Sequence, residues 1–393
     1  MIEQCNVHDA SAPQPGGRLA VDQSAGPGVE RDGFRNRKVM AFATFGGDRV
    51  RLEGLLQLVG AEFISLQTRP RLGGFLRLIR KFRRTRPGLV IMEGTGVAGG
   101  AAVMLSRLLL GTRYVVSSGD AVGPFLARKY GWLWPIFNAY ERMLYRWSAG
   151  FIGWSQYFVG RALTYGAPRA MTAGGWADFR LDAQQRRALG DAVRRHLGIA
   201  PATIVVGIAG SLNWNRRVGY CYGLELVRAL RQTARTDLCA LIVGDGDGRR
   251  HLEKAAGADL GTRVILTGKV TRWVLPGYLA AMDAGSLPQS VDQVGALRYT
   301  TKLSEYLAAS LPIITGQLPL AYDLGGDWLW RLPGNSPWDD KYIASLTTVL
   351  DNLTPDVIET KRAAIPRDLP EFDRNRQIRA VTAFLNDILS EPG

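Results

Sequence analysis

The sequence is poor in cysteine and histidine. It has 393 residues but only three cysteines and three histidines. The cysteines, Cys5, Cys221 and Cys239, show no CxxC spacing, so we expect neither a disulfide framework nor a cysteine-type zinc site. This usage fits a reducing compartment, and the few histidines give little support to histidine-dependent catalysis.

Long uncharged apolar runs are also missing. The best candidate, residues 97–110, contains Arg107 and has the length of a buried helix, so we expect no membrane-spanning segment. Residues 1–37 lack the positive start and apolar stretch of a secretory signal, and we predict a disordered leader there. The expected location is the cytoplasm.

Acidic residues are scarce in the amino-terminal half. The net charge is +14, and residues 38–170 alone hold 19 Lys and Arg against 6 Asp and Glu, a balance of +13. No acidic residue lies between Glu62 and Glu93. A balance this basic is typical of proteins that bind nucleic acid, anionic lipid or phosphorylated ligands.

The cations are densest in residues 69–86, where apolar residues recur at helical spacing. This pattern predicts a basic amphipathic helix, which either packs on a sheet with a solvated basic face or faces lipid. No recognisable nucleic-acid motif accompanies the charge, so nucleic acid is the less favoured partner. The candidate membrane-facing residues are Arg77, Arg80, Lys81, Arg83 and Arg84.

A second stretch, residues 132–147, places aromatic residues and cations along a helix that we expect to begin at Pro135. Such a mixture suits a lipid headgroup interface. The alternative is one long helix whose aromatic residues face the core.

Strand-length apolar runs alternate with helical patterns twice along the chain. The runs are residues 39–44, 62–66, 89–92, 114–117 and 151–154, then 204–209, 238–243, 264–266 and 312–315. Repeated strand–helix units imply parallel sheets covered on both faces. We therefore predict an α/β fold of two doubly wound, Rossmann-like domains that face each other across a cleft, where open parallel sheets bind ligands.

The predicted organisation has five parts. It consists of the leader (1–37), an amino-terminal Rossmann-like domain (38–175), a linker helix (176–200), a carboxy-terminal Rossmann-like domain (201–370) and a last helix (371–393) that could pack back on the amino-terminal domain.

Polar and glycine residues follow the strands of the first domain. Gly46 and Gly47 form a turn that leads into a helix start, where a backbone can approach an anion. The GxGxxG fingerprint and the acidic residue of dinucleotide-binding domains are missing, which disfavours an NAD enzyme. Glu93, Thr95 and Asp120 follow two further strands. They could orient sugar hydroxyls or accept a proton, or Thr95 and Asp120 could simply cap helices.

The second domain carries an ordered series of phosphate-binding features. Gly210 and Ser211 open a glycine-rich loop that contains Arg217, a residue type suited to bidentate capture of phosphate oxygens. Lys302 and Glu305 lie near a helix start, where they could balance diphosphate charge and accept hydrogen bonds from a ribose diol. Further candidate donor-binding residues between them are Gly244, Asp245, Gly246 and Lys269.

This ordered set resembles the carboxy-terminal domain of family 4 retaining glycosyltransferases, which have the two-domain GT-B fold. The resemblance covers residues 204–315 and extends more faintly over residues 39–178. It implies that Arg217 replaces the basic residue of the family's KG loop, that Lys302 contacts the donor diphosphate and that Glu305 binds the donor ribose.

The resemblance also implies that Gly46 and Gly47 lie near the donor phosphate and the acceptor. The chain departs from the family pattern at two positions. Ser211 stands where an Arg is usual, and Leu297 stands where the first Glu of the paired motif is expected.

The expected function is a metal-independent, retaining transfer of a hexose from a nucleoside-diphosphate sugar. Because no DxD-type acidic pair stands out as a metal site, Arg217, Lys302 and helix-terminal amides are expected to stabilise the leaving diphosphate. Asp120 is the candidate for acceptor positioning. We expect no cofactor beyond the donor.

The expected acceptor is a lipid-linked glycan of envelope or exopolysaccharide synthesis, met at the anionic inner face of the cell membrane. Two alternatives remain at this point: a sugar-nucleotide epimerase of the same architecture, and a non-catalytic nucleic-acid-binding protein.

Overall fold

The structure is a computed structural model, and it describes residues 38–44, 49–66, 71–129 and 131–391. The predicted leader, residues 1–37, lies outside these ranges. So do Gly46 and Gly47.

The first sheet has six strands in the order β2-β1-β3-β4-β5-β6, and every neighbouring pair is parallel. The strands are β1 (Val39–Ala43), β2 (Glu62–Phe63), β3 (Leu89–Glu93), β4 (Arg113–Ser118), β5 (Gly150–Gly153) and β6 (Ala170–Thr172). The helical elements between them are α1 (Arg49–Leu55), α2 (Arg71–Thr85), α3 (Val97–Leu110), α4 (Val122–Lys129), η3 (Gly131–Leu133), α5 (Trp134–Arg146) and α6 (Gln156–Thr164). These elements and the last helix, α15 (Arg374–Ser390), are called the amino-terminal lobe.

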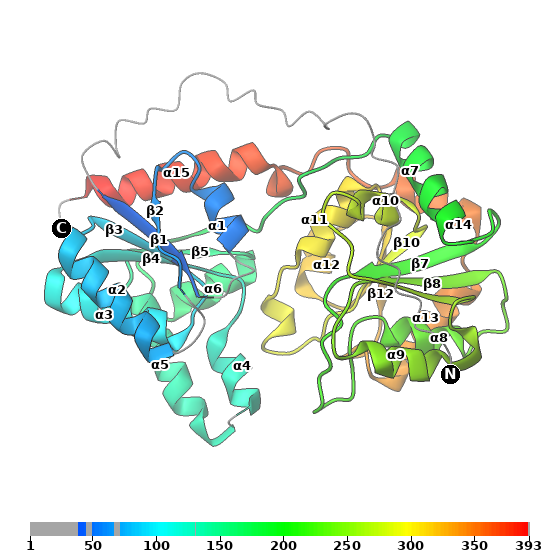
Figure 1. The fold of residues 1–393 in the computed structure, drawn as a ribbon, viewed down its shortest axis with the longest axis horizontal. Coiled ribbons are helices and arrows are strands. Elements are labelled where there is room, and N and C mark those ends of the chain that lie inside the picture. The colour runs from blue at the N-terminus through cyan, green and yellow to red at the C-terminus, as the bar shows by residue number, and fades with distance from the viewer. Residues whose placement is uncertain (1–37, 45–48, 67–70, 130, 392–393) are drawn as a thin grey trace, which may run out of the picture. The chain divides into compact units, whose positions relative to one another are not determined.

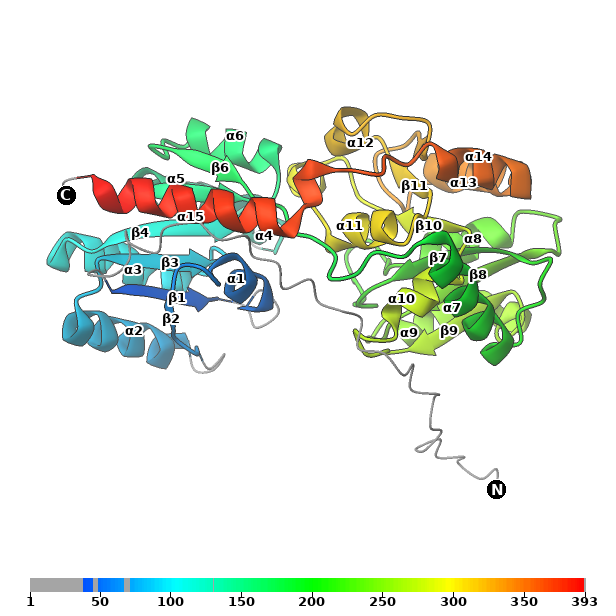
Figure 2. The ribbon, with the colours of Figure 1, turned by 90° about the horizontal axis from the view of Figure 1, so that it is seen from above.

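Successive strand residues of this lobe pack on opposite faces of the sheet, as the pleat requires. Met40 and Val90 share an apolar cluster with buried residues of α2, α3, α5 and α6. Val39 and Ile91 belong to the cluster formed with α1 and α15. Figures 1 and 2 show α15 lying along the face opposite α2 and α3. The last helix of the chain thus completes the cover that a parallel sheet needs on both faces.

The second sheet also has six parallel strands, in the order β12-β11-β10-β7-β8-β9. The strands are β7 (Ile204–Ala209), β8 (Leu238–Val243), β9 (Val264–Gly268), β10 (Ala284–Leu287), β11 (Ile313–Gly316) and β12 (Leu329–Leu332). The α-helices are α7 (Ala183–His196), α8 (Leu224–Leu230), α9 (Arg249–Ala256), α10 (Leu275–Ala280), α11 (Thr301–Ala308), α12 (Pro319–Asp323), α13 (Asp340–Asp351) and α14 (Pro355–Ala363). Short 3-10 turns are η4 (Gly257–Asp259), η5 (Gly295–Leu297) and η6 (Pro370–Phe372). Apart from η6, which leads into α15, these elements are called the carboxy-terminal lobe.

Helices cover both faces of the second sheet. Buried residues of α8, α9 and α13 pack on one face, and residues of α7, α10 and α11 pack on the other. Local signals in the sequence explain where some of these helices start. In α7, for example, the Asp182 side chain accepts a hydrogen bond from the Gln185 amide at 2.8 Å, and the Gln185 side chain accepts one from the Asp182 amide at 3.1 Å.

The predicted fold class is confirmed, since both sheets are parallel and Rossmann-like. Strands β7 and β8 have the predicted bounds, whereas β2 ends at Phe63, earlier than predicted. Three strands, β6, β10 and β12, are absent from the prediction. Two of them, β6 and β12, are edge strands of their sheets. The third, β10, is a short run of small residues in which Gly285 leaves room for the side chains of Tyr306 and Leu311.

Among the described residues, no helix is both long and apolar enough to cross a bilayer. The predicted domain boundaries remain predictions.

We predict that Leu385→Ala in α15 destabilises the amino-terminal lobe by about 2–5 kcal/mol, because truncation of a buried leucine removes apolar contacts and leaves a cavity. Leu385 is 0% exposed. Urea unfolding followed by circular dichroism measures the loss. The matched control is Arg379→Ala on the exposed side of the same helix, for which a change within about 0.5 kcal/mol is expected. Equal stability of the two variants would contradict the packing of α15.

Candidate active site

The order of the second sheet reverses between β7 and β10. Strand β8 lies on one side of β7, and β10 lies on the other, after two intervening strands of sequence. The loops that follow β7 and β10 therefore leave in opposite directions, which opens a crevice at the carboxyl ends of these strands. Gly210 follows β7, and α11 follows β10, so the candidate donor residues lie at this switch point.

Lys302, in the first turn of α11, reaches the end of β7. A Cβ atom built on Gly210 would lie 2.8 Å from Lys302 Cε and 2.9 Å from its Nζ. Any larger residue at position 210 would therefore displace the lysine. The ammonium also lies 4.3 Å from the centre of the Tyr222 ring, a cation–π arrangement, and Gln289 Nε2 donates to the Tyr222 hydroxyl at 3.3 Å. These contacts hold the ammonium at the carboxyl edge of the sheet.

The glycine-rich segment after β8 is bonded to the loop after β7. The Leu212 amide donates to the Asp245 carbonyl at 3.0 Å, and the Gly248 amide donates to the Leu212 carbonyl at 2.8 Å. Gly244 has a φ of +147°, and a Cβ there would lie 1.8 Å from the Gly210 carbonyl oxygen. A Cβ atom on residue 246 would likewise clash with the Leu212 backbone. Glycine is required at both positions because two backbones meet at this point.

Glu305 lies one turn after Lys302 on α11, so the two side chains share a helix face. Burial raises the pKa of Glu305 above its ordinary value, and the nearby Lys302 and Arg272 cations oppose that rise. The first two turns of α11 therefore present a cation and a half-buried carboxyl group next to the switch point, near the positive end of the helix dipole.

The remaining predicted donor residues lie around this centre. Ser211 is exposed directly after Gly210, and Lys269 is exposed directly after β9. The Asp245 carboxylate accepts a hydrogen bond from the Gly246 amide at 2.8 Å. Arg217 is exposed near the tip of a turn, where its amide donates to Asn215 Oδ1 at 3.1 Å. The catalytic role of Arg217 stays a prediction.

In the amino-terminal lobe, Glu93 is 0% exposed and is bonded by groups of its own lobe. Arg51 donates to Glu93 Oε2 at 2.7 Å, and Trp154 Nε1 donates to Oε1 at 3.0 Å. The Arg51 guanidinium lies 4.4 Å from the centre of the Trp154 ring and also donates to Ser117 Oγ at 3.1 Å. Glu93 thus orients Arg51 and Trp154 at the carboxyl ends of β3, β4 and β5.

Thr95 is buried, and its carbonyl accepts a hydrogen bond from the Tyr140 hydroxyl at 3.2 Å. Asp120 follows β4, and its carboxylate accepts a hydrogen bond from Arg298 Nε at 2.8 Å. The acceptor roles of Glu93, Thr95 and Asp120 stay predictions.

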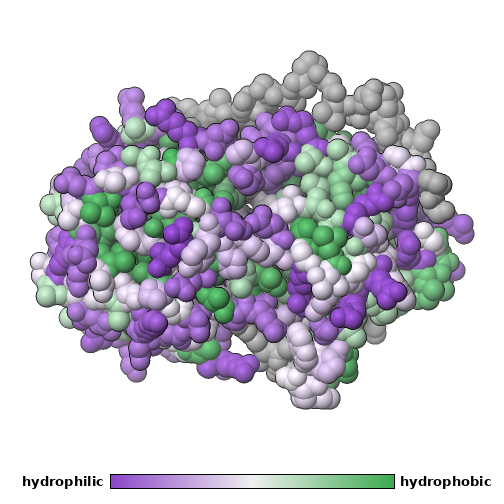
Figure 3. Space-filling model, turned by 180° about the vertical axis from the view of Figure 1, so that it is seen from behind, coloured by the Kyte–Doolittle hydropathy of each residue, from purple (hydrophilic) through white to green (hydrophobic). Residues whose placement is uncertain are grey.

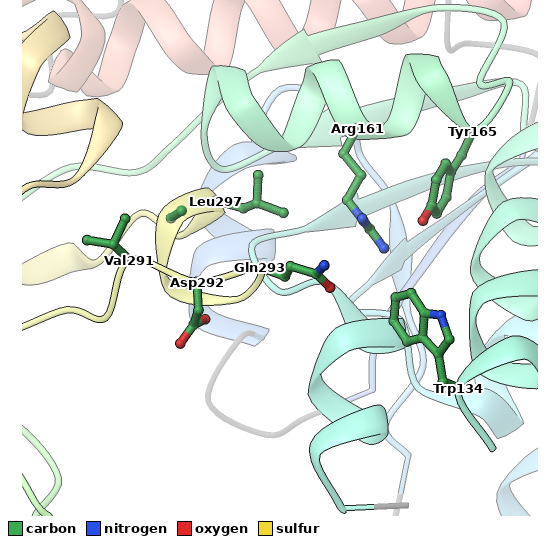
Figure 4. A pocket seen from close by; sticks show the side chains of 8 residues that line it. Trp134, Arg161, Tyr165, Val291, Asp292, Gln293 and Leu297 are labelled. Atoms are coloured by element: carbon green, nitrogen blue, oxygen red, sulfur yellow. The ribbon is translucent and has the colours of Figure 1, made fainter. Parts of the chain in front are cut away.

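A pocket of about 480 Å³ is lined by residues of both sequence halves. Its walls are Trp134, Arg161, Tyr165, Val291, Asp292, Gln293, Ala296 and Leu297. Figure 4 shows the Gln293 amide directed toward the guanidinium of Arg161 and the indole of Trp134. Arg161 donates to both carboxylate oxygens of the buried Glu141 at 2.9 Å. The pocket therefore combines aromatic walls with polar groups.

Helix α2 carries the predicted cationic face. Arg77, Arg80, Arg83 and Arg84 are exposed, and Lys81 is half-buried with its Nζ 2.6 Å from a Glu62 oxygen. On the side of the molecule seen in Figure 3, hydrophobic residues lie in separate patches among hydrophilic ones. Within the described ranges, no group of three or more His, Cys, Asp and Glu residues could hold a metal ion.

Three residues that support the candidate site are missing from the sequence prediction: Tyr222, Gln289 and Glu225. Glu225 is buried, and it accepts hydrogen bonds from the Tyr220 hydroxyl at 2.8 Å, the Gly223 amide at 3.0 Å and Ser286 Oγ at 2.9 Å. These bonds fix the segment that carries Tyr222. The only signal in the sequence is an acidic residue placed inside an otherwise apolar helix pattern.

Part of the carboxy-terminal lobe is similar to a known protein family. Residues 203–327 match the model of a family described as "Glycosyl transferases group 1". This segment runs from the residue before β7 to the fourth residue after α12 and contains the switch point and α11. No curated protein matches the chain.

Solved structures share the fold over most of the chain. Alr3699/HepE from Anabaena, solved with UDP and glucose, has a TM-score of 0.66 at 16% identity, covering 90% of this chain and 100% of its own. Sucrose-phosphate synthase from Thermosynechococcus elongatus has a TM-score of 0.63 at 13% identity and covers 89% and 98%. WaaG, a glycosyltransferase of lipopolysaccharide biosynthesis, has a TM-score of 0.59 at 13% identity and covers 90% and 100%.

The two Rossmann-like sheets and these structural matches show that the chain has the GT-B fold. Within this fold, residues 203–327 of the carboxy-terminal lobe match the group 1 glycosyltransferases. The predicted resemblance is thereby confirmed.

We predict that Glu225→Gln changes how stability depends on pH. Burial raises the pKa of Glu225 above its unfolded value of 4.5, so the folded state binds the proton more tightly than the unfolded state. The resulting stabilisation is present below the unfolded pKa and is lost as pH rises through the folded pKa. Urea unfolding at about pH 5 and about pH 7.5 should show wild type losing free energy of unfolding relative to Glu225→Gln at the higher pH.

The control for this measurement is Gln184→Ala on the exposed side of α7, which involves no titratable group, so its difference from wild type should stay the same at both pH values. A Glu225→Gln difference that is equally independent of pH would show that Glu225 does not titrate as its burial implies.

Proposed function

We propose that the chain transfers a hexosyl group from a nucleoside-diphosphate sugar to a lipid-linked glycan acceptor, without a metal ion and with retention at the anomeric carbon. The observation that carries the proposal is the position of Lys302 at the switch point of the second sheet, beside Gly210 and above the Tyr222 ring. A diphosphate bound there would meet an ammonium and the amide end of α11.

Lys302 supplies the charge that a metal ion supplies in other transferases. The bond from the anomeric carbon to the β-phosphate oxygen breaks, and negative charge grows on the leaving diphosphate. A cation already fixed at that place stabilises this charge without reorganisation at the moment of reaction. In the proposal Arg217, which lies on the turn after β7, adds a second cation to the same diphosphate.

Glu305 is proposed to accept hydrogen bonds from the donor ribose, one helical turn from Lys302. UDP is the nucleotide favoured for the first tests, since Alr3699/HepE was solved with UDP and glucose. Retention is carried over from the resemblance to family 4 enzymes.

The acceptor is proposed to be lipid-linked and to belong to envelope or exopolysaccharide synthesis. Two of the structural neighbours are WaaG, a glycosyltransferase involved in lipopolysaccharide biosynthesis, and WaaB, a lipopolysaccharide outer core galactosyltransferase. The exposed cations of α2 support docking of the amino-terminal lobe on the anionic inner face of a cell membrane. Asp120 is proposed to position the acceptor.

We predict that Lys302→Ala and Glu305→Ala each lower transfer from the nucleotide sugar at least about a hundredfold, because charge neutralisation and donor orientation are both lost. Release of UDP from UDP-sugars, measured with and without EDTA, follows the reaction, and EDTA should leave the wild-type rate unchanged. The control is Lys341→Ala on the exposed side of α13, which should keep wild-type turnover. Wild-type turnover by both site variants, with unchanged melting temperatures, would refute the proposal.

We also predict that replacing the α2 cations by Gln lowers flotation with anionic vesicles at least about tenfold, since each Lys or Arg near such a surface contributes about 1 kcal/mol. The variant changes Arg77, Arg80, Lys81, Arg83 and Arg84. A matched control changes five exposed cations of the carboxy-terminal lobe, namely Arg187, Arg195, Arg228, Arg250 and Lys254. Equal recovery of wild type with anionic and neutral vesicles would exclude electrostatic docking.

A further inference from the structure

Helix α5 and the turn before it carry an apolar stripe that faces solvent. The stripe consists of Trp132, Ile136, Ala139, Met143 and Trp147, at intervals of four, three, four and four residues. This spacing places all five side chains on one side of a helix. They are all exposed, and Trp132 and Ile136 are the most accessible, at 83% and 62%.

The other side of α5 packs against the core of the amino-terminal lobe. Leu144 and Tyr145 are buried in the cluster that α5 shares with α2, α3 and α6. The Tyr140 hydroxyl donates to the Gly96 carbonyl at 3.2 Å, which ties α5 to the start of α3. The helix is therefore held by one face, and the apolar stripe on the opposite face needs a separate explanation.

The surroundings of the stripe are cationic. Arg142 and Arg146 are exposed directly before Met143 and Trp147. Between Glu93 and Asp178 the sequence contains only two acidic residues, Asp120 and Glu141. Glu141 is 0% exposed and bonded to Arg161, so α5 presents no acidic side chain to solvent.

A neighbouring helix adds apolar surface of the same kind. Leu108 and Leu109, at the end of α3, are 70% and 67% exposed. Helices α2, α3 and α5 all pack on the same face of the first sheet, and Figure 1 shows them on one side of it. Exposed leucines and the cationic face of α2 thus occur on the same side of the sheet as the stripe of α5.

We infer that the stripe of α5 enters the headgroup region of an anionic bilayer, with the helix lying in the plane of the membrane. This inference deepens the proposed function and rests on it. Tryptophan at the two ends of the stripe is suited to the headgroup level, and the flanking arginines match anionic lipid. The α2 cations attract the lobe at a distance, whereas the α5 stripe supplies the apolar contact that salt does not screen.

The position of α5 also relates the bilayer to the pocket. Trp134, in the first turn of α5, lines the pocket, whereas Trp132 and Ile136 on either side of it belong to the stripe. The start of α5 thus carries both membrane-facing residues and a pocket wall, two residues apart in the sequence. A glycan attached to a membrane lipid would reach the pocket along the start of α5.

The test compares two variants of the full chain in flotation with vesicles that contain an anionic lipid. The first, Ile136→Gln with Met143→Gln and Trp147→Gln, removes the apolar character of the stripe at exposed positions. The control, Leu260→Gln with Tyr322→Gln and Val357→Gln, changes three exposed apolar residues of the carboxy-terminal lobe. Melting temperatures verify that both variants fold.

We expect the stripe variant to lose at least about tenfold in vesicle binding at physiological salt, and the control to bind like wild type. Wild type should also retain part of its binding when high salt screens the α2 cations. Equal binding of the stripe variant and wild type would overturn the inference. A wild-type dimer that the stripe mutations convert to a monomer would overturn it as well, because the stripe would then meet a second copy.

Catalysis is measured separately, with a soluble, lipid-free acceptor analogue. The stripe variant should keep wild-type transfer to this acceptor and lose transfer to the same glycan on vesicles. If wild type transfers sugar to neither acceptor, the result counts against the proposed function. If wild type and the stripe variant are equally active on vesicles, the result counts only against membrane insertion of the stripe.

Discussion

The site depends on one close approach, that of the Lys302 ammonium to the backbone of Gly210. A lysine in the first turn of α11 can reach the end of β7 only because position 210 has no side chain. The same position is next to Gly244, where the backbones of two loops also meet without an intervening Cβ. Glycine at these strand ends therefore both shapes the crevice and allows a cation to lie within it.

The contacts around Lys302 also explain why the cation is held in place. The Tyr222 ring lies below the ammonium, and Glu225, although it touches neither group, fixes the segment that carries Tyr222. Placing a charge before the ligand arrives lowers the reorganisation that binding and catalysis require. Burial of Glu225 is costly, and its three hydrogen bonds offset only part of the lost hydration, since its pKa is raised.

Much of the fold could be predicted from the sequence, because apolar strands buried on both faces give continuous runs such as β7 and β8. The strand β10 could not, since its small residues are selected by the neighbouring Tyr306 and not by strand propensity. Likewise, the order of the motifs in the sequence predicts that the glycines and Lys302 belong to the site. The contact between the Tyr222 ring and the Lys302 ammonium could not be predicted, because it depends on the tertiary structure alone. The sequence predicts that the Glu93 side chain points into a ligand crevice. Its hydrogen bonds with Arg51 and Trp154 could not be predicted, because these residues are distant in the sequence.

The central claim is that Lys302 binds the donor diphosphate at the switch point of the second sheet. The most direct measurement is a crystal structure of the full chain with bound UDP. The account predicts a β-phosphate oxygen about 2.7–2.9 Å from Lys302 Nζ, next to the start of α11. A diphosphate bound elsewhere, with Lys302 still over Tyr222 and remote from it, would contradict the account.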